Sequence, residues 1–242
     1  MNESLFYINQ RYREPLYLNS KTKIKCPHCK NSILTLKRDD VRFHEINISK
    51  NNHHEIWFES EHTIFQFTAF LTCPLCSDFT IATGHGSYDE YHDYEQNIHE
   101  CSEIFHPEYF IPTVHIFDLP SKCPKEVSFH IESSFKLAWA DESAAGNKIR
   151  IAIEFLVETL IGKSKKRLDD RIRSLDGEHE KIKEYLLAIK WLGNDASHDA
   201  SLKEHDLAFA YKILEQVLNY LYGDRRMLDF LTKKVNENKG RL

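Results

Sequence analysis

Apolar residues follow different periods in the two halves of the chain. Between Ser32 and about Glu90 they alternate with polar residues in several short runs that are rich in β-branched and aromatic side chains. This pattern is typical of half-buried antiparallel strands. The β-forming runs cover residues 33–36, 41–46, 56–58, 63–68 and 79–83, and several of them, not all, alternate in this way. Residues 84–123 contain a Gly-His-Gly segment and three prolines, and we expect them to connect the two halves.

From Pro124 onward the apolar period becomes helical. Pro124 is expected to open a helix, because its missing N–H costs nothing in the first turn. Apolar residues then fall on one face in three stretches, with the spacing of amphipathic helices. The stretches contain Ile149, Ile153, Leu156 and Leu160, then Ile182, Leu186 and Ile189, then Leu207, Tyr211, Leu214, Leu218 and Leu221. Gly223 is expected to end the third as a C′ glycine, and a further helix is predicted over about 224–237.

Two Cys-Pro-x-Cys pairs, Cys26–Cys29 and Cys73–Cys76, lie within the strand-rich half. Four thiolates in two such turns predict one structural, tetrahedral Zn²⁺ per chain. A closed four-sulfur site leaves no coordination position for catalysis. Each pair is expected at a hairpin turn, as in a zinc ribbon, with extra strands between the pairs. Lys30 and Ser77 replace the glycine that often follows such a pair, and we expect Asn31 to take the left-handed conformation after the first.

The pattern as a whole predicts an α+β protein. A zinc-ribbon-like β domain with its connector is expected at residues 1–120, and a bundle of four to six helices at 121–242. The start of the chain lacks the features of a signal peptide, and no apolar run approaches the roughly 20 residues that cross a bilayer. We therefore expect a cytoplasmic protein that does not contact a membrane, with Cys101 and Cys123 as spare or buried thiols.

Charge is divided unevenly between the two halves. Residues 1–120 contain 10 Lys+Arg and 17 Asp+Glu, and residues 121–242 contain 22 and 20, so the halves carry −7 and +2. An acidic zinc-binding half is a poor match for a phosphate backbone, which argues against a DNA-reading finger. A basic cluster in the second half is interpreted as a solvated helix face with local ion pairs, with nucleic-acid contact as the alternative. This cluster comprises Lys163, Lys165, Lys166, Arg167, Arg171 and Arg173.

The candidate catalytic residues are Lys190, Asn194 and His198, which are spaced i, i+4, i+8. If one helix continues through Gly193, they form a single stripe that could bind a phosphate and move a proton near neutral pH. The alternative is structural: Gly193 and Asn194 end the helix, and His198 satisfies a buried carbonyl. The spacing leaves both interpretations open.

These motifs resemble, in their order and spacing, the prokaryotic domain-of-unknown-function family 4145. The resemblance extends over about residues 24–225, from the cysteine pairs to Gly193-Asn194…His198 and the last amphipathic helix. It also includes features on and before the first bundle helices, namely Pro120, Pro124, Val127, Ala144, Ala145, Arg150, Leu168 and Ile172. The family is regarded as a branch of the HEPN superfamily of helical nucleotide-binding and RNA-cleaving domains.

The resemblance implies a HEPN-like bundle, a homodimer through that bundle, and a role in restriction or antiviral defence. A nucleic-acid-associated sensor or accessory module is the expected function, with RNA, DNA or a defence-system protein as partner. The alternatives are a metal-independent endoribonuclease centred on His198 and a non-catalytic dimerisation scaffold. Active HEPN proteins carry an arginine where this chain has Gly193. Phosphate charge would then have to be met by Lys190, Arg150 or a dimer partner.

Overall fold

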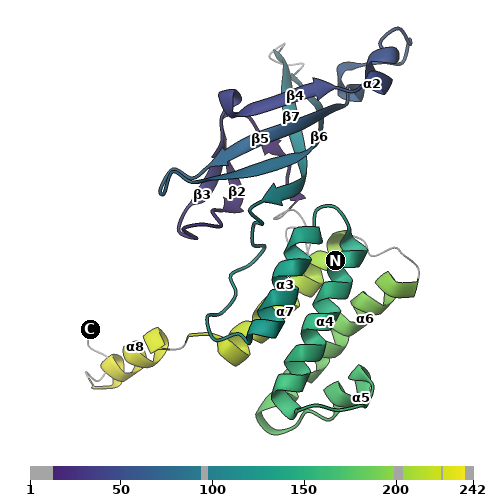
Figure 1. Cartoon of the computed structure of the whole chain (residues 1–242). Coiled ribbons are helices and arrows are strands. Elements are labelled where there is room, and N and C mark those ends of the chain that lie inside the picture. The colour runs from purple at the N-terminus through teal and green to yellow at the C-terminus, as the bar shows by residue number, and fades with distance from the viewer. Residues whose placement is uncertain (1–12, 94–97, 199–203, 225, 238–242) are drawn as a thin grey trace.

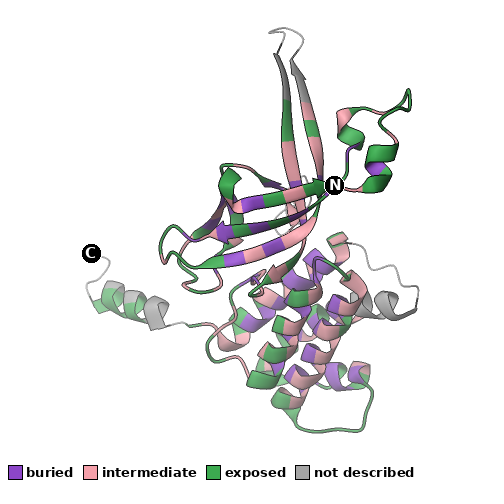
Figure 2. Ribbon diagram, turned by 45° about the horizontal axis from the view of Figure 1, so that its top comes forward, coloured by how far each residue is buried: buried purple, intermediate pink, exposed green. Residues whose placement is uncertain are grey.

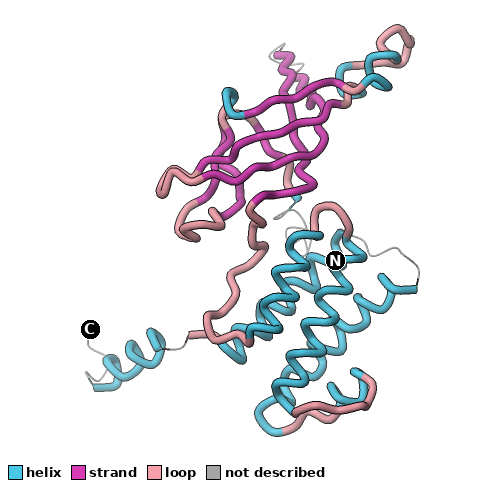
Figure 3. The backbone as a smooth tube through the Cα atoms, viewed as in Figure 1, coloured by secondary structure: helices cyan, strands magenta, loops and turns pink. Residues whose placement is uncertain are grey.

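The computed structural model of the 242-residue chain describes residues 13–93, 98–198, 204–224 and 226–237. Strands occupy the region from residue 16 to 111, and helices occupy the region from 125 onward. Figure 3 shows the strand-rich part in magenta above the helical part in cyan, joined by a loop over 112–124. The predicted α+β class is confirmed. The boundary predicted between residues 120 and 121 falls within this loop.

In the described part of the chain, seven antiparallel strands form one sheet in the order β1-β7-β6-β5-β3-β2, with β4 beside β5. The strands are β1 (Leu16–Tyr17), β2 (Ser20–Lys25), β3 (Ile33–Leu36), β4 (Val41–Glu45), β5 (Phe65–Thr72), β6 (Phe79–Asp93) and β7 (Ile98–Ile111). Only Leu18 and Asn19 separate β1 from β2, although these strands lie at opposite ends of the order. The sheet therefore curls until its two ends approach each other (Figure 1).

The inner face of the curled sheet forms the core of this region. Along β5 the odd-numbered residues from Phe65 to Leu71 are buried, whereas Gln66, Thr68 and Phe70 are exposed, so the predicted alternation is confirmed. Phe105 of β7 meets the ring of Phe65 at 5.5 Å between centroids. Such edge-to-face aromatic pairs stabilise a core beyond the area that they bury.

The pairing between β3 and β5 is the weak point of the sheet. Strand β3 pairs with β5 through a single register pair, Thr35 with Thr72, whereas β5 pairs with β6 from Phe65 to Thr72. The hydroxyl of Thr35 adds a hydrogen bond of 3.1 Å to the carbonyl of Thr72. The β2–β3 hairpin is therefore held to the rest of the sheet by few backbone contacts.

The strand predicted at residues 56–58 is wrong. These residues belong to an excursion between β4 and β5 that contains helix α2 (Asn47–Asn51) and the 3-10 turn η3 (Ser60–His62). Ile56 and Trp57 are exposed there. Three consecutive apolar residues do not alternate, so they cannot place one face on a core and the other in solvent.

The connector predicted at residues 84–123 is also largely wrong, because residues up to 111 form most of β6 and β7. Gly84 and Gly86 are strand residues that other atoms approach closely. A Cβ on Gly84 would lie 2.2 Å from the carbonyl oxygen of His106, and one on Gly86 would lie 2.2 Å from the ring of Phe65. Beyond Gly86, β6 pairs with β7 alone, and this hairpin projects from the sheet (Figure 2).

The helical region confirms the predicted stripes. Its helices are α3 (Lys125–Leu137), α4 (Glu142–Ile161), α5 (Leu168–Arg173), α6 (Lys183–His198), α7 (Glu204–Tyr222) and α8 (Arg226–Glu237), with the 3-10 helix η4 (Gly177–Ile182) before α6. The chain packs α3 on α4, α4 on α6 and α6 on α7, whereas α8 extends away from these helices (Figure 1). Pro124 precedes α3 at the N-cap, one position before the predicted one. Gly223 follows α7 but does not have a positive φ, so the predicted C′ glycine is absent.

A buried polar contact fixes the packing of α3, α4 and α7. The Ser134 hydroxyl donates to the carbonyl of Ala145 at 2.8 Å, and its oxygen lies 2.6 Å from the hydroxyl of Tyr211. Since the single serine proton goes to the carbonyl, Tyr211 donates to Ser134. Both hydroxyls are thus satisfied within the core.

The strand-rich and helical regions touch each other at several points. The rings of Phe110 and Trp139 pack edge to face at 4.9 Å, and Arg13 donates to the carbonyl of Ala138 at 2.9 Å. Arg13 also pairs with Glu142 at 2.6 Å, at the start of α4. None of the helices in the described part of the chain combines the length and apolar character that a bilayer crossing requires.

Candidate functional site

The four cysteines of the two Cys-Pro-x-Cys pairs form one cluster at one end of the sheet. The first pair occupies the turn between β2 and β3, and the second occupies the turn between β5 and β6. The Sγ atoms of all four lie within 4.8 Å of one another. Cys26 Sγ lies 3.7 Å from Cys76 Sγ, and Cys29 Sγ lies 3.7 Å from Cys73 Sγ. A disulfide needs about 2.05 Å, and all four cysteines are free thiols.

The two turns have the same backbone hydrogen bonds. Lys30 N–H donates to Cys26 O, and Ser77 N–H donates to Cys73 O, both at 3.0 Å. Lys30 and Ser77 have φ values of 58° and 64°, so each takes the left-handed conformation directly after its cysteine pair. The expectation that Asn31 would take it is wrong. The position is set by the turn itself, where glycine is usually found because it bears no Cβ.

The surroundings of the sulfurs favour thiolate at one position and oppose it at another. A hydrogen bond from the backbone amide of Cys76 lowers the pKa of the Cys73 thiol to about 6, against the desolvation that raises it. At Cys76 the amide of Asp78 lowers the pKa, but burial and hydrogen bonds with the other three cysteines raise it to about 12. Four adjacent thiolates repel one another unless a cation lies between them. The cluster is therefore suited to a metal ion.

This cluster is the one group of three or more potential His, Cys, Asp or Glu ligands found among the described residues. Cys26 and Cys73 are fully buried, and Cys29 and Cys76 are partly buried. Cys101 is exposed and Cys123 is half-buried, and neither belongs to the cluster. A metal ion bound by all four sulfurs would have its tetrahedral positions filled by protein, so the site can organise the fold but offers no position for a substrate.

The helical candidate site lies on α6. This helix continues without interruption through Gly193 and ends at His198, so Lys190, Asn194 and His198 share one helix. The alternative in which Gly193 and Asn194 end the helix is wrong. The side chains of Asn194 and His198 lie outside the described part of the structure, and their contacts stay a prediction.

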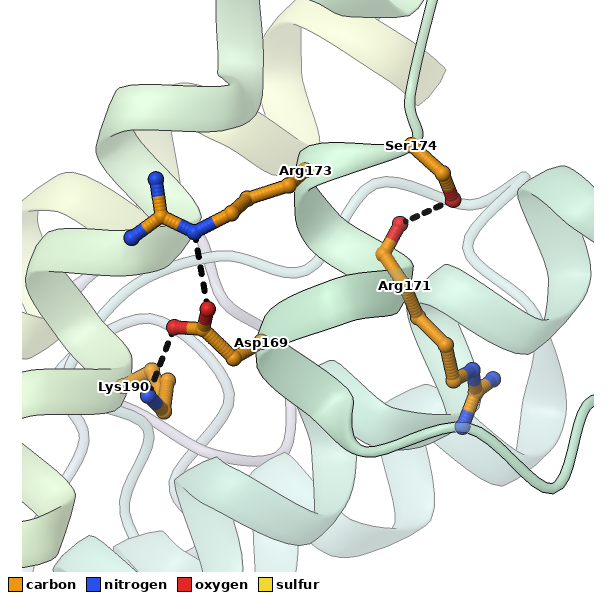
Figure 4. Close-up of polar contacts among 5 residues, drawn as sticks. All are labelled: Asp169, Arg171, Arg173, Ser174 and Lys190. Atoms are coloured by element: carbon orange, nitrogen blue, oxygen red, sulfur yellow. Dashed lines mark hydrogen bonds and ion pairs between the residues drawn. The ribbon is translucent and has the colours of Figure 1, made fainter.

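Lys190 is described, and its ammonium group is paired. Its Nζ lies 2.8 Å from Oδ1 of Asp169 on α5, while Nε of Arg173 lies 2.7 Å from Oδ2 of the same carboxylate (Figure 4). Hydrogen bonds from Lys190 and Arg173 lower the pKa of Asp169, which stays ionised near neutral pH. The Lys190 side chain is only 12% exposed. Its charge is therefore balanced by a carboxylate and partly removed from solvent.

Arg150 is the other cation in this chain that could replace the missing arginine. It lies on α4, and its Nε is 3.6 Å from Oε1 of Glu154, one turn further along the helix. Among the described residues, Nε of Arg150 has no hydrogen-bond partner, whereas Nζ of Lys190 has one, so the ion pair of Arg150 with its carboxylate is the weaker of the two. Neither of the two cations identified from the sequence is left with an uncompensated charge.

A hollow of about 730 Å³ on the outer face of the sheet was not found from the sequence. It lies over β4, β5, β6 and β7, and its lining includes Arg42, His44, Gln66, His85 and Tyr109. The available signal was the alternation along β5, which predicts that Gln66 and Thr68 point to solvent. Which residues of β4 and β7 lie beside them depends on long-range pairing.

Two family models match the chain. Residues 132–240 match the model described as Domain of unknown function (DUF4145), which confirms the predicted family for the helical region but not for the cysteine pairs. Residues 14–110 match a second model, described as Domain of unknown function (DUF8608), which covers the strand-rich region. Comparison with curated proteins and comparison with solved structures each found no match.

Proposed function

Taking as premise that residues 132–240 form a DUF4145 domain, we propose that the protein is a zinc-stabilised accessory module of a prokaryotic restriction or antiviral defence system. In this proposal it associates with nucleic acid and senses or presents it without cutting it. The bundle is HEPN-like and forms a homodimer. The observation that carries the non-catalytic role is the pairing of Lys190 with Asp169.

Zinc is the metal that the four cysteines favour. A tetrahedral Zn²⁺ with Zn–S bonds of about 2.3 Å places neighbouring sulfurs about 3.8 Å apart. Two sulfur pairs are 3.7 Å apart and all four sulfurs lie within 4.8 Å of one another, which is close to the spacing of such a site. The site would be structural, because the metal joins two turns that are far apart in the sequence. By joining these turns, the metal would hold in place the surface of the sheet that contacts the partner.

The same geometry argues against cleavage of RNA. Catalysis of the HEPN type needs a cation that stabilises the charge of the phosphate in the transition state, and Gly193 supplies none. Lys190 would have to leave Asp169 to serve, and Arg150 would have to leave Glu154. Lysine is also a poorer bidentate clamp for phosphate than arginine. A binding role requires neither rearrangement.

The ribonuclease alternative keeps one supporting observation, which is that α6 extends unbroken from Lys183 to His198. Incubation of zinc-loaded protein with a mixed RNA pool in a Mg²⁺-free buffer tests it, with His198→Ala as the matched variant. We expect the same RNA pattern from both proteins. Cleavage by the wild type that disappears in His198→Ala would replace the accessory role with the ribonuclease.

The accessory role itself is tested by binding. We expect the full-length, zinc-loaded protein to bind an RNA or DNA oligonucleotide with an affinity that falls as salt rises, because cationic contacts to phosphates release counterions. Absence of binding to single-stranded and double-stranded RNA and DNA at low salt would overturn the nucleic-acid part of the proposal.

A further inference from the structure

We propose that the outer face of the sheet formed by β5, β6 and β7 is a binding surface for single-stranded nucleic acid, whose bases stack on its exposed aromatic side chains. This inference rests on the proposed function and identifies the surface and the form of nucleic acid. It is carried by the strand register, the exposure of the aromatic residues and the adjoining hollow.

The register places a continuous set of side chains on the outer face. Phe70 of β5 stands opposite Ile81 of β6, and Ile81 stands opposite Ile111 of β7. One step along the strands, Thr83 stands opposite Tyr109. Phe70, Tyr109 and Ile111 are 43%, 51% and 65% exposed. The chain neighbours of Phe70 on β5, Ala69 and Leu71, are buried in the inner core, so Phe70 takes no part in it.

The aromatic side chains of this face lie close together. The ring of Phe79, which is half exposed, stands edge to face against Phe70 at 5.3 Å. A contiguous exposed apolar patch on a folded protein usually marks an interaction site. Exposed aromatic residues on an open sheet face are the platform on which several RNA-binding modules stack unpaired bases.

The hollow adds groups that can read base edges. Its lining includes Tyr109 and the polar residues Arg42, His44, Gln66, Thr68 and Thr83. Nη1 of Arg42 donates to the carbonyls of Asp39 and Val41, and the Thr83 hydroxyl donates to the carbonyl of Phe67, so the remaining polar groups of the lining are the ones available to a base. Its volume of about 730 Å³ is within the range of sites that hold small molecules or nucleotides. These donors and acceptors suit the Watson–Crick edges of bases that are not paired.

The carboxylates at this hollow are already engaged. Oε1 of Glu108 lies 2.8 Å from Nδ1 of His85. Oε1 of Glu45 accepts from the Ser49 hydroxyl at 2.6 Å and lies 2.6 Å from Nε2 of His53. Both carboxylates in the lining are therefore held by hydrogen bonds, and the phosphates of a bound strand must lie away from them, toward the edge that carries Lys21.

Basic residues continue the same face toward the edge of the sheet. Lys21 of β2 stands opposite Thr35, Thr35 opposite Thr72, and Thr72 opposite Phe79, so Lys21 and Phe79 lie in one row across four strands. With strands about 4.8 Å apart, the row spans roughly 14 Å. Lys23 and Lys25 follow on the same edge, but Lys23 Nζ lies 2.5 Å from Oε1 of Glu14 and Lys25 Nζ lies 2.5 Å from Oδ2 of Asp118. Lys21 can therefore meet a phosphate while the bases lie on the aromatic rings, whereas Lys23 and Lys25 would first have to leave their carboxylates.

Part of the negative charge of residues 1–120 lies away from the outer face of the sheet. Asp89, Glu90 and Glu103 belong to the β6–β7 hairpin beyond Gly86, where it has left the sheet. The net charge of −7 therefore does not describe the outer face. Part of the acidic character of residues 1–120 thus lies off the outer face, on which Arg42 and Lys21 accompany Glu45 and Glu108.

The test measures binding of the full-length, zinc-loaded protein to labelled oligonucleotides of about 16 nucleotides by fluorescence anisotropy. Single-stranded RNA, single-stranded DNA and a duplex are compared in separate arms. The variants are Tyr109→Ala and Phe79→Ala, with Tyr109→Phe as the conservative replacement. The matched controls are Trp57→Ala and Tyr185→Ala, whose side chains are 55% and 54% exposed but do not belong to this face. Zinc content and melting temperature confirm that each variant folds.

We expect single strands to bind more tightly than the duplex. Because stacking on one aromatic side chain contributes about 1–3 kcal/mol per base, Tyr109→Ala and Phe79→Ala should each weaken binding about 5- to 150-fold. Tyr109→Phe should retain the affinity, and the two controls should change it by about twofold or less. The difference between the RNA and DNA arms identifies which single strand is preferred.

Three outcomes overturn the inference in distinguishable ways. If the wild type binds a single strand but Tyr109→Ala and Phe79→Ala bind equally well, the surface is wrong and the proposed function stands. If Lys165→Glu with Lys166→Glu abolishes binding while the face variants retain it, the helical loop is the contact surface instead. If the wild type binds no nucleic acid, the proposed function fails together with the inference, and the face is left to a protein partner.

Discussion

Replacing Ser77 by glycine is expected to stabilise the protein. Ser77 has a φ of 64°, and its exposed side chain follows the second cysteine pair. A residue with a Cβ pays about 1–2 kcal/mol in the left-handed region. Glycine avoids that cost but loses more backbone freedom on folding, which offsets roughly 0.5–1 kcal/mol. The net gain in free energy of unfolding should be about 0.5–1 kcal/mol.

The same calculation applies to Lys30, which has a φ of 58° at the equivalent position of the first pair. Asn31 provides a matched control, because it follows Lys30 directly, is exposed and does not have a positive φ. Lys30→Gly should therefore stabilise, and Asn31→Gly should destabilise by roughly 0.5–1 kcal/mol through lost backbone entropy.

The assay is thermal and denaturant unfolding of zinc-loaded proteins at a fixed concentration of free zinc, since bound metal adds to the measured stability. For a chain of this size, a change of 1 kcal/mol moves the melting temperature by about 2–4 °C. Ser77→Gly and Lys30→Gly should melt higher than the wild type and Asn31→Gly lower. If all three glycine variants lose stability alike, the strain assigned to the left-handed residues is absent and the reasoning is refuted.

Three further predictions follow from the structure. Metal analysis should find about one Zn²⁺ per chain, and Cys73→Ser should lose it with a lower melting temperature; a folded wild type that holds no metal would contradict the site. Light scattering should report a homodimer. A monomer at every protein concentration would contradict the proposed dimer. Lys190 and Arg173 lower the pKa of Asp169 in the folded state, so its stabilising effect should be present near neutral pH and disappear as the pH falls through that pKa. The difference in melting temperature between wild type and Asp169→Asn, measured at a series of pH values, should accordingly narrow below about pH 4. A difference that stays constant would show that the ion pairs of Asp169 do not cause it.

Local patterns predicted the parts of the fold that depend on local geometry. The alternation along β5 and the apolar stripe of α4 each reflect which face of a single element meets the core, so the sequence of that element suffices. The cysteine pairs were recognised for the same reason, since each pair lies in one turn. The family of the helical region could be predicted from the order of these motifs.

Other features were missed because they depend on distant residues. Gly84 and Gly86 resemble a loop in the sequence, but their lack of a side chain serves the close approach of His106 and Phe65. Likewise, the partner of Lys190 is Asp169, which lies in the sequence between members of the basic cluster that was interpreted as a solvated helix face. Neither relation is visible until strands and helices are paired in space.

Because β3 and β5 share a single register pair, the metal cluster can hold these two strands together. Thr72, which makes that pair, directly precedes Cys73, and β3 follows Cys29 after a short turn. A metal ion held by the four sulfurs therefore cross-links β3 and β5 where they share a single register pair. On metal loss we expect the β2–β3 hairpin to open as a local unit while β5, β6 and β7 stay paired, with amide hydrogen exchange rising first at residues 20–36. Zinc would then control whether the lysine-bearing edge stays in line with the aromatic strands.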